Sequence, residues 1–162
     1  MTRIAWLAAL AAFSLSSSAF AALTLERSTT VTDSFGGKLA ISTNGSIEIP
    51  GADTATQVAL LNFHPHDKQT LSANGSLART HERSSETVTN TYNGSVTLSG
   101  TDKEGKPVSD TLALQNVQVV RDGSGPVFSG TVVFNGTSID AAQLPEAAKQ
   151  RLRSVLRLFE FD

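Results

Sequence analysis

The chain has 162 residues, a net charge of −2 at neutral pH, and charges of both signs spread along its length. It has no basic stripe, and aromatic residues make up only 6% of it, which argues against a surface for nucleic acids or stacked sugars. It also has no cysteine, which excludes a disulfide-stapled scaffold and a cysteine nucleophile. We therefore expect one domain with a single hydrophobic core.

Residues 1–21 have the order of a secretory signal peptide. Arg3 lies near the amino end, the run Ile4–Phe13 has no polar side chain, and Ala19-Phe20-Ala21 has the small-x-small pattern of a cleavage site. The apolar run is about half of the roughly 20 residues that a membrane-spanning helix needs. We expect cleavage after Ala21 and export to the periplasm or the extracellular medium, with no transmembrane segment in the mature chain.

Residues 22–140 have the texture of an antiparallel β domain. Apolar and β-branched residues alternate with polar ones, and clusters rich in Gly, Asp and Asn interrupt them. The expected fold is mainly β, an antiparallel meander that forms a small barrel or sandwich. Strands are expected near Leu23–Val31, Lys38–Ser42, Ser46–Ile49, Gln57–Phe63, Gln69–Ser72, Ser76–Arg83, Glu86–Thr91, Ser95–Thr101, Val108–Arg121 and Val127–Phe134.

Four Asn-Gly pairs are typical of hairpin turns. They are Asn44-Gly45, Asn74-Gly75, Asn93-Gly94 and Asn135-Gly136. A three-residue loop at the first pair sets Ile41 opposite Ile47 and keeps the apolar side chains on one face. The same choice suits the second and third pairs, so we expect positive φ angles in three-residue loops at Gly45 and Gly94.

At the fourth Asn-Gly pair a two-residue loop is expected, because it pairs Val132 with Ile139. All four pairs also fit the N-glycosylation pattern Asn-x-Ser/Thr, although turn chemistry explains them without a sugar. The segments 44–53 and 93–102 resemble each other at an offset of 49 residues. Chance convergence on hairpin chemistry explains that likeness as well as duplication does.

Residues 141–162 change to a helical pattern. Pro145 suits the first position of a helix, and an apolar stripe follows it at helical spacing. The stripe consists of Ala148, Leu152, Val155, Leu156 and Phe159, and a second face carries Lys149, Arg153 and Arg157. We expect one amphipathic α-helix packed on the sheet of the same domain, and the alternative is a helix that lies on a membrane or a protein partner.

All three histidines of the chain fall within one stretch, as His64, His66 and His81. In an extended segment residues two apart point the same way, so His64 and His66 could bind one metal ion, with His81 from a neighbouring strand as a third ligand. Neutral imidazole suits zinc or copper. The alternative is a solvated loop without metal, since His, Pro and Asp are ordinary loop residues.

Nothing in the sequence points to an enzyme. It lacks the Gly-x-Ser-x-Gly motif, a phosphate-cradling glycine loop before a helix, and a paired carboxylate constellation. No other cofactor is indicated. The expected function is that of an exported, non-catalytic binding or structural module. The alternatives are a carrier of a small hydrophobic ligand in a barrel-like cavity and a metal-binding protein that uses His64, His66 and His81.

Overall fold

The computed structural model describes residues 23–48, 51–65, 70–101, 104–156 and 159. Eight strands follow one another along the chain, and a short 3-10 helix and an α-helix come after them. The strands are β1 (Leu23–Thr32), β2 (Lys38–Glu48), β3 (Gly51–Phe63), β4 (Leu71–Arg83), β5 (Val88–Thr101), β6 (Pro107–Arg121), β7 (Pro126–Phe134) and β8 (Thr137–Asp140). The helices are η2 (Ala141–Gln143) and α1 (Glu146–Leu156).

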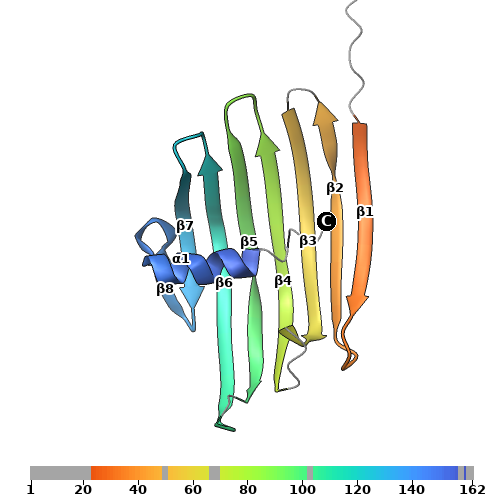
Figure 1. Cartoon of the computed structure of the whole chain (residues 1–162), viewed down its shortest axis with the longest axis vertical. Coiled ribbons are helices and arrows are strands. Elements are labelled where there is room, and N and C mark those ends of the chain that lie inside the picture. Colours follow the sequence, from red (N-terminus) through yellow and green to blue (C-terminus); the bar gives the residue numbers. More distant parts are fainter. Residues whose placement is uncertain (1–22, 49–50, 66–69, 102–103, 157–158, 160–162) are drawn as a thin grey trace, which may run out of the picture.

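The eight strands form one antiparallel sheet in the order in which they occur in the chain (Figure 1). This confirms the expectation of a mainly β, antiparallel meander. The sheet is open, however, with β1 and β8 at opposite edges, and the described residues form neither a closed barrel nor a second sheet. Because β8 has only four residues, it offers little edge with which the ten-residue β1 could close a barrel.

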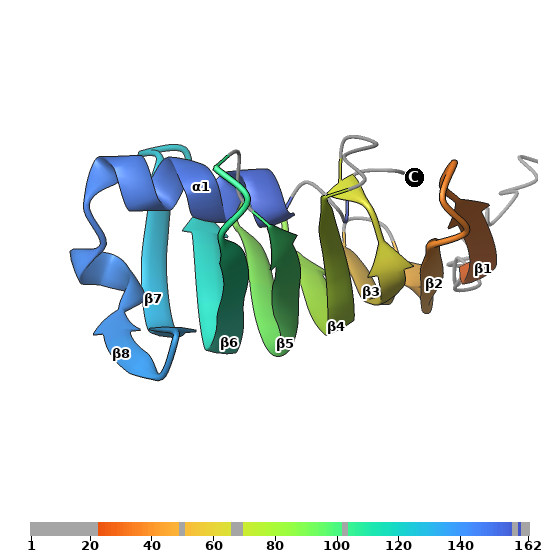
Figure 2. The same ribbon diagram turned by 90° about the horizontal axis from the view of Figure 1, so that it is seen from below.

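The helix α1 lies against one face of the sheet, across β5 to β7 (Figures 1 and 2). The core lies between α1 and that face, which we call the helix-side face; the other is the open face. From the segment that follows the sheet the core receives Ala141, Leu144, Leu152, Leu156 and Phe159. From the sheet it receives Leu39, Ile41, Val58, Leu60, Ala73, Leu77, Tyr92, Leu114, Val117, Val119, Phe128 and Val132.

The structure corrects the turn assignment of three Asn-Gly pairs. Those at Asn44, Asn74 and Asn93 lie inside β2, β4 and β5, and the strands run straight through them. Gly45 is not among the glycines with positive φ, and Gly94 has a φ of 115° but sits within a strand rather than in a loop. The two-residue loop at Asn135-Gly136 is confirmed, with Val132 paired to Ile139.

The glycines of the mid-strand pairs allow neighbouring backbones to approach closely. A Cβ atom on Gly75 would meet the carbonyl oxygen of Ser95, and one on Gly94 would meet that of Ser76. Gly75 and Gly94 stand within the apolar series of β4 and β5 on the helix-side face. The chain does not reverse at either glycine, so the apolar residues on both sides of it stay on that face. The Asn-Gly pairs that favour hairpin turns elsewhere serve here to let a neighbouring backbone approach closely.

The asparagines of two mid-strand pairs support backbone bulges in an adjacent strand, β3 for Asn74 and β6 for Asn93. The side-chain oxygen of Asn74 accepts a hydrogen bond from the backbone N–H of Asn62 at 2.8 Å, and that of Asn93 accepts one from Asn116 at 2.8 Å. Asn62 and Asn116 have φ angles of 48° and 49°, the left-handed region that asparagine tolerates. The strand register shifts at both places, so each hydrogen bond satisfies a donor that the bulge displaces.

The two bulges are built alike on either side of the central pair β4 and β5. The carbonyl of Asn62 packs over Gly37 beside β2, and that of Asn116 packs over Gly130 in β7. Counted outward from the centre of the sheet, the first bulge involves β4, β3 and the segment beside β2, and the second involves β5, β6 and β7. The first series runs backward along the chain and the second runs forward, so a two-fold rotation of the sheet relates the bulges. Tandem duplication, which would preserve the order of the strands, does not produce this arrangement.

Close backbone approach at Gly94 predicts a severe cost for a methyl group. Gly136, in the β7–β8 loop, has a φ of 80°, and a Cβ atom there would have no neighbour within 4 Å, so Gly136→Ala should cost only the strain of about 1–2 kcal/mol. Gly94→Ala adds the collision with the Ser76 carbonyl and should cost at least ~1 kcal/mol more. Urea unfolding of both variants measures the difference, and equal losses would contradict the close approach.

The packing of α1 predicts that its apolar stripe carries stability. Leu152 is 4% exposed, whereas Leu61 on β3 is 60% exposed. Leu152→Ala should lower the free energy of unfolding by about 2–5 kcal/mol, because it removes a buried side chain and leaves a cavity. The matched control Leu61→Ala should cost under ~1 kcal/mol. Thermal and urea unfolding provide the values, and a Leu152→Ala variant as stable as the control would show that α1 does not pack on the sheet.

Candidate functional site

A row of polar side chains crosses the helix-side face from β1 to β4. The register pairs Arg27 with Thr43, Thr43 with Thr56, and Thr56 with Arg79, and direct cross-strand partners share a face. The hydroxyl oxygens of Thr43 and Thr56 lie 3.1 Å apart, and both side chains are buried. Arg79 Nη2 donates to Thr56 Oγ1 at 3.4 Å. The buried threonine pair thus helps to position one arginine head group.

Arg79 also rests against an aromatic side chain of the C-terminal segment. Its guanidinium carbon lies 5.5 Å from the centroid of the Phe159 ring, which packs in turn against Tyr92. A cation over an aromatic ring is attracted by the ring's quadrupole. The Nε atom of Arg79 is buried and has no hydrogen-bond partner, so this arginine keeps an unused donor.

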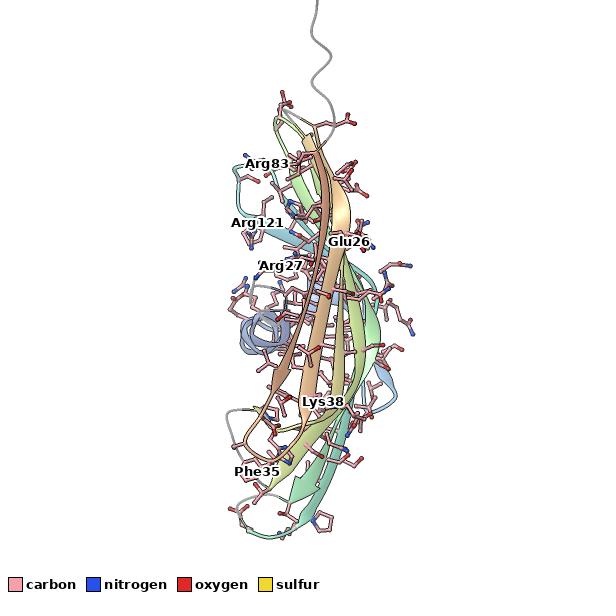
Figure 3. All side chains as sticks on the ribbon, turned by 90° about the vertical axis from the view of Figure 1, so that its right-hand side faces the viewer. Glu26, Arg27, Phe35, Lys38, Arg83 and Arg121 are labelled. Carbon is pink, nitrogen blue, oxygen red and sulfur yellow. The ribbon has the colours of Figure 1, made fainter. Side chains whose placement is uncertain are left out.

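Two further arginines continue along the same face toward the ends of β4 and β6. Arg83 pairs with Val88 across to β5, and Val88 pairs with Arg121 on β6. Both arginine side chains are exposed. We call Arg27, Arg79, Arg83 and Arg121 the arginine face; Figure 3 shows three of them, Arg27, Arg83 and Arg121, on the side of the sheet that carries the helix.

Most acidic residues of the same strands lie on the opposite side of the sheet, whereas Asp110, near the start of β6, pairs with Leu98 and lies on the helix-side face. Glu26 precedes Arg27 and Glu82 precedes Arg83, and successive residues of a strand point to opposite faces. Glu82 pairs with Asp53, which places that carboxylate on the open face as well. The salt bridges found among the described residues join Asp33 to His64 and Glu146 to Arg153, and neither involves the arginine face. Positive charge is therefore concentrated on one side.

Helix α1 adds two half-buried cations close to this face. Lys149 Nζ lies 5.8 Å and the Arg153 guanidinium carbon 5.4 Å from the centroid of the Phe128 ring. Phe128 pairs with Val119, which stands opposite Asn90. Asn90 is 7% exposed, and its side-chain oxygen lies 2.9 Å from Nδ1 of His81. Basic and polar groups thus surround the region between α1 and the ends of β4 to β6.

A separate polar cluster ties the β1–β2 turn to the end of β3. The carboxylate of Asp33 accepts hydrogen bonds from the backbone N–H groups of Phe35 and Gly37, and from both the backbone and Nδ1 of His64. Burial raises the pKa of the Asp33 carboxyl, but the hydrogen bonds from His64 and from the turn outweigh burial and lower this pKa to about 2. The His64 ring also packs against Phe35.

The structure does not bring the predicted histidines together as a metal site. His81 pairs with Thr54 near the start of β3, whereas His64 follows the end of β3, so the length of that strand separates them. The expectation that His81 lies beside His64 is therefore wrong, because antiparallel pairing sets the end of β4 beside the start of β3. His66 lies outside the described residues. No group of three or more His, Cys, Asp or Glu side chains in the described part could hold a metal ion.

Two shallow hollows lie over the strands of the open face. Their volumes are about 240 and 150 Å³, and both include Gln57 and Ala59. The larger extends over Ser76, Ala78 and Asn93. Both volumes are below the roughly 300 Å³ at which ligand pockets begin, so neither hollow is a site for a drug-sized molecule.

No family model, curated protein or solved structure matches this chain. Within the described residues, no helix has the length and apolar character needed to cross a membrane.

Sequence reasoning missed the arginine face, although a signal for it was present. Arg79, His81 and Arg83 alternate with uncharged or acidic residues at a period of two, the period of a strand with one basic face. The sequence also sets Glu26 beside Arg27 and Glu82 beside Arg83. Adjacent residues of opposite charge cancel when charge is summed along the chain. Only the alternation of side chains in a strand, which places them on opposite faces, reveals the basic face.

The hydrogen bonds of Asp33 predict an acid-sensitive contribution to stability. Since the folded pKa of about 2 lies below the unfolded value of about 3.9, this group stabilises the fold above pH ~4, and the contribution is lost as the pH falls toward 2. Asp33→Asn should lower the melting temperature at pH 7 and flatten its fall between pH 4 and 2. Glu26→Gln, on the exposed edge strand, serves as the control. An unchanged acid limb in Asp33→Asn would contradict the assignment.

Proposed function

We propose that this chain is an exported, non-catalytic binding module, and that its arginine face takes an extended polyanion such as an acidic polysaccharide. Export rests on the signal-peptide pattern of residues 1–21. The observation that carries the binding proposal is the separation of charge across the sheet, with the arginines on the helix-side face and Glu26, Asp53 and Glu82 on the open face. No salt bridge of the described part neutralises those arginines.

The spacing of the arginines favours a long ligand over a single small anion. Arg83 and Arg121 lie on strands two apart, which corresponds to roughly 10 Å between backbones. Arg79 and Arg83 lie on one strand at a separation of about 13 Å, and Arg27 is three strands away from β4. One phosphate or carboxylate could bridge Arg83 and Arg121, but it cannot contact all four arginines at once. A polymer with a charge on each repeating unit can contact several of them at once.

Arginine suits such a ligand because its planar guanidinium donates two parallel hydrogen bonds to one carboxylate or sulfate group. Arg79 enters with its head group already held between Thr56 and Phe159. Arg83 and Arg121 are exposed and can adjust to the ligand. A surface with one fixed cation and several adjustable ones should select a ligand by the spacing of its charges more than by its exact shape.

The carrier of a small hydrophobic ligand remains a second proposal with weaker support. The apolar space beside α1 is filled by side chains such as Leu77, Leu114 and Phe159, each less than 2% exposed. A metal-binding role has His64 as its best described ligand, since Asp33 contacts Nδ1 and leaves Nε2 for a metal ion. Neither alternative uses the separation of charge across the sheet.

Titration of the secreted protein with a polyuronate oligomer tests the polyanion proposal. In low salt, Arg83→Ala should weaken binding roughly three- to tenfold, or ~0.7–1.4 kcal/mol, because one charge-assisted contact is lost. The matched control Lys38→Ala removes one positive charge from the open face (Figure 3) and should change affinity less than about twofold. Binding should also fall as salt is raised.

A neutral oligosaccharide of the same length and a single-stranded DNA of the same charge complete the test. The neutral sugar should not bind. Tighter binding of DNA than of the polyuronate would contradict the proposal that the ligand is an acidic polysaccharide. Equal losses of polyuronate affinity in Arg83→Ala and Lys38→Ala would show that net charge alone, without a defined face, is responsible for binding.

A further inference from the structure

The edge strand β1 presents a backbone that no other described strand covers, and its charged residues are Glu26 and Arg27 at the centre. All ten of its residues pair with β2 without a register shift, and the sheet of described strands continues no further on its other side. β1 contains no proline and no bulge, and its apolar residues Leu23 and Val31 are 65% and 49% exposed. Natural sheets normally protect such an edge, because its free N–H and C=O groups invite another strand.

The opposite edge of the sheet differs. β8 has four residues, and the chain then turns into η2 and α1. A head-to-tail contact of β1 with β8 would therefore use only a short ladder. The partner that matches the length of β1 is β1 itself.

We propose that β1 pairs antiparallel with β1 of a second copy of this chain, around a two-fold axis at Ser28. In antiparallel pairing directly opposed residues share a face. The two-fold axis must therefore pass midway between two directly opposed copies of the same residue. The remaining question is which residue of β1 lies on the axis.

Charge excludes two of the central choices. An axis at Arg27 would set two arginines directly opposite each other, and an axis at Glu26 would do the same with two glutamates. An axis at Ser28 sets two small hydroxyl side chains opposite each other and gives each charged residue a threonine as its partner, Thr29 for Arg27 and Thr30 for Glu26.

Apolar pairing and ladder length favour the same axis. With Ser28 at the centre, Leu25 of each copy stands opposite Val31 of the other, on the helix-side face, and the ladder covers residues 24–32. An axis at Thr29 shortens the ladder to residues 26–32 and loses both Leu25–Val31 pairs. The sequence of β1 is thus complementary to itself in one register.

This pairing also enlarges the proposed binding surface. Both copies present the same face on the same side, so two arginine faces become one, with the two Arg27 side chains as diagonal neighbours about 7–8 Å apart. A polyanion that spans the junction would offset their mutual repulsion. This consequence rests on the proposed function, whereas the pairing of β1 with β1 does not.

Because the chain has no cysteine, single cysteine variants of the secreted protein test the register without a background. In mild oxidant and without any ligand, Ser28→Cys should form a covalent dimer far faster than Ser138→Cys on β8, the edge-strand control. Glu26→Cys alone and Thr30→Cys alone should crosslink slowly, but their equimolar mixture should form a heterodimer, because these two positions face each other across the axis. Circular dichroism checks that every variant is folded.

Charge at the axis provides the second measurement, by sedimentation. Ser28→Glu alone and Ser28→Lys alone should be monomers, and their mixture should dimerise again. Crosslinking of Ser28→Cys no faster than that of Ser138→Cys, or a native protein that is monomeric at about 100 μM, would overturn the proposal. Because the crosslinking and sedimentation are done without a polyanion, a negative result there would not contradict binding by the arginine face. Likewise, failure to bind polyuronate would not contradict the pairing of β1 with β1.

Discussion

The pleat of one continuous antiparallel sheet is the constraint on which the other features depend. Cross-strand partners share a face, so a single register from β1 to β8 decides which side chains meet α1 and which meet water. Leu39, Val58 and Leu77 enter the core for that reason, and so do the threonines that hold Arg79. A slip of one residue in β4 would put Glu82 in the place of Arg83 and would turn Arg79 to the open face.

The sequence predicted the class of the fold well and its turns poorly. Alternation of apolar and polar residues correctly indicated antiparallel strands, and the two-residue loop at Asn135-Gly136 followed from pairing Val132 with Ile139. The other Asn-Gly pairs misled because local turn chemistry is the same whether the chain reverses or two backbones approach each other. Only the neighbouring strand, with the carbonyl of Ser76 or the bulge at Asn116, distinguishes these cases, and sequence spacing does not reveal that neighbour.

The same limit explains the candidate site. The histidines attracted attention because they are close in the chain, yet pairing of β3 with β4 sets His81 beside Thr54 and far from His64. The arginines are distant in the chain and are interleaved with acids, yet the register gathers them on one face. A surface of this kind suits binding through many weak contacts. The unpaired edge at β1 is consistent with this, since a second copy would lengthen that surface.

Nuclear Overhauser contacts between backbone protons of the isotope-labelled protein would test the register most directly. The account predicts cross-strand contacts that link Thr56 to Arg79 and Arg79 to Tyr92, together with unbroken strand patterns through Asn74-Gly75 and Asn93-Gly94. Contacts between Leu71 and Leu77 would contradict it, because they arise only if the chain reverses at Asn74-Gly75. The arginine face would then no longer exist as a single surface.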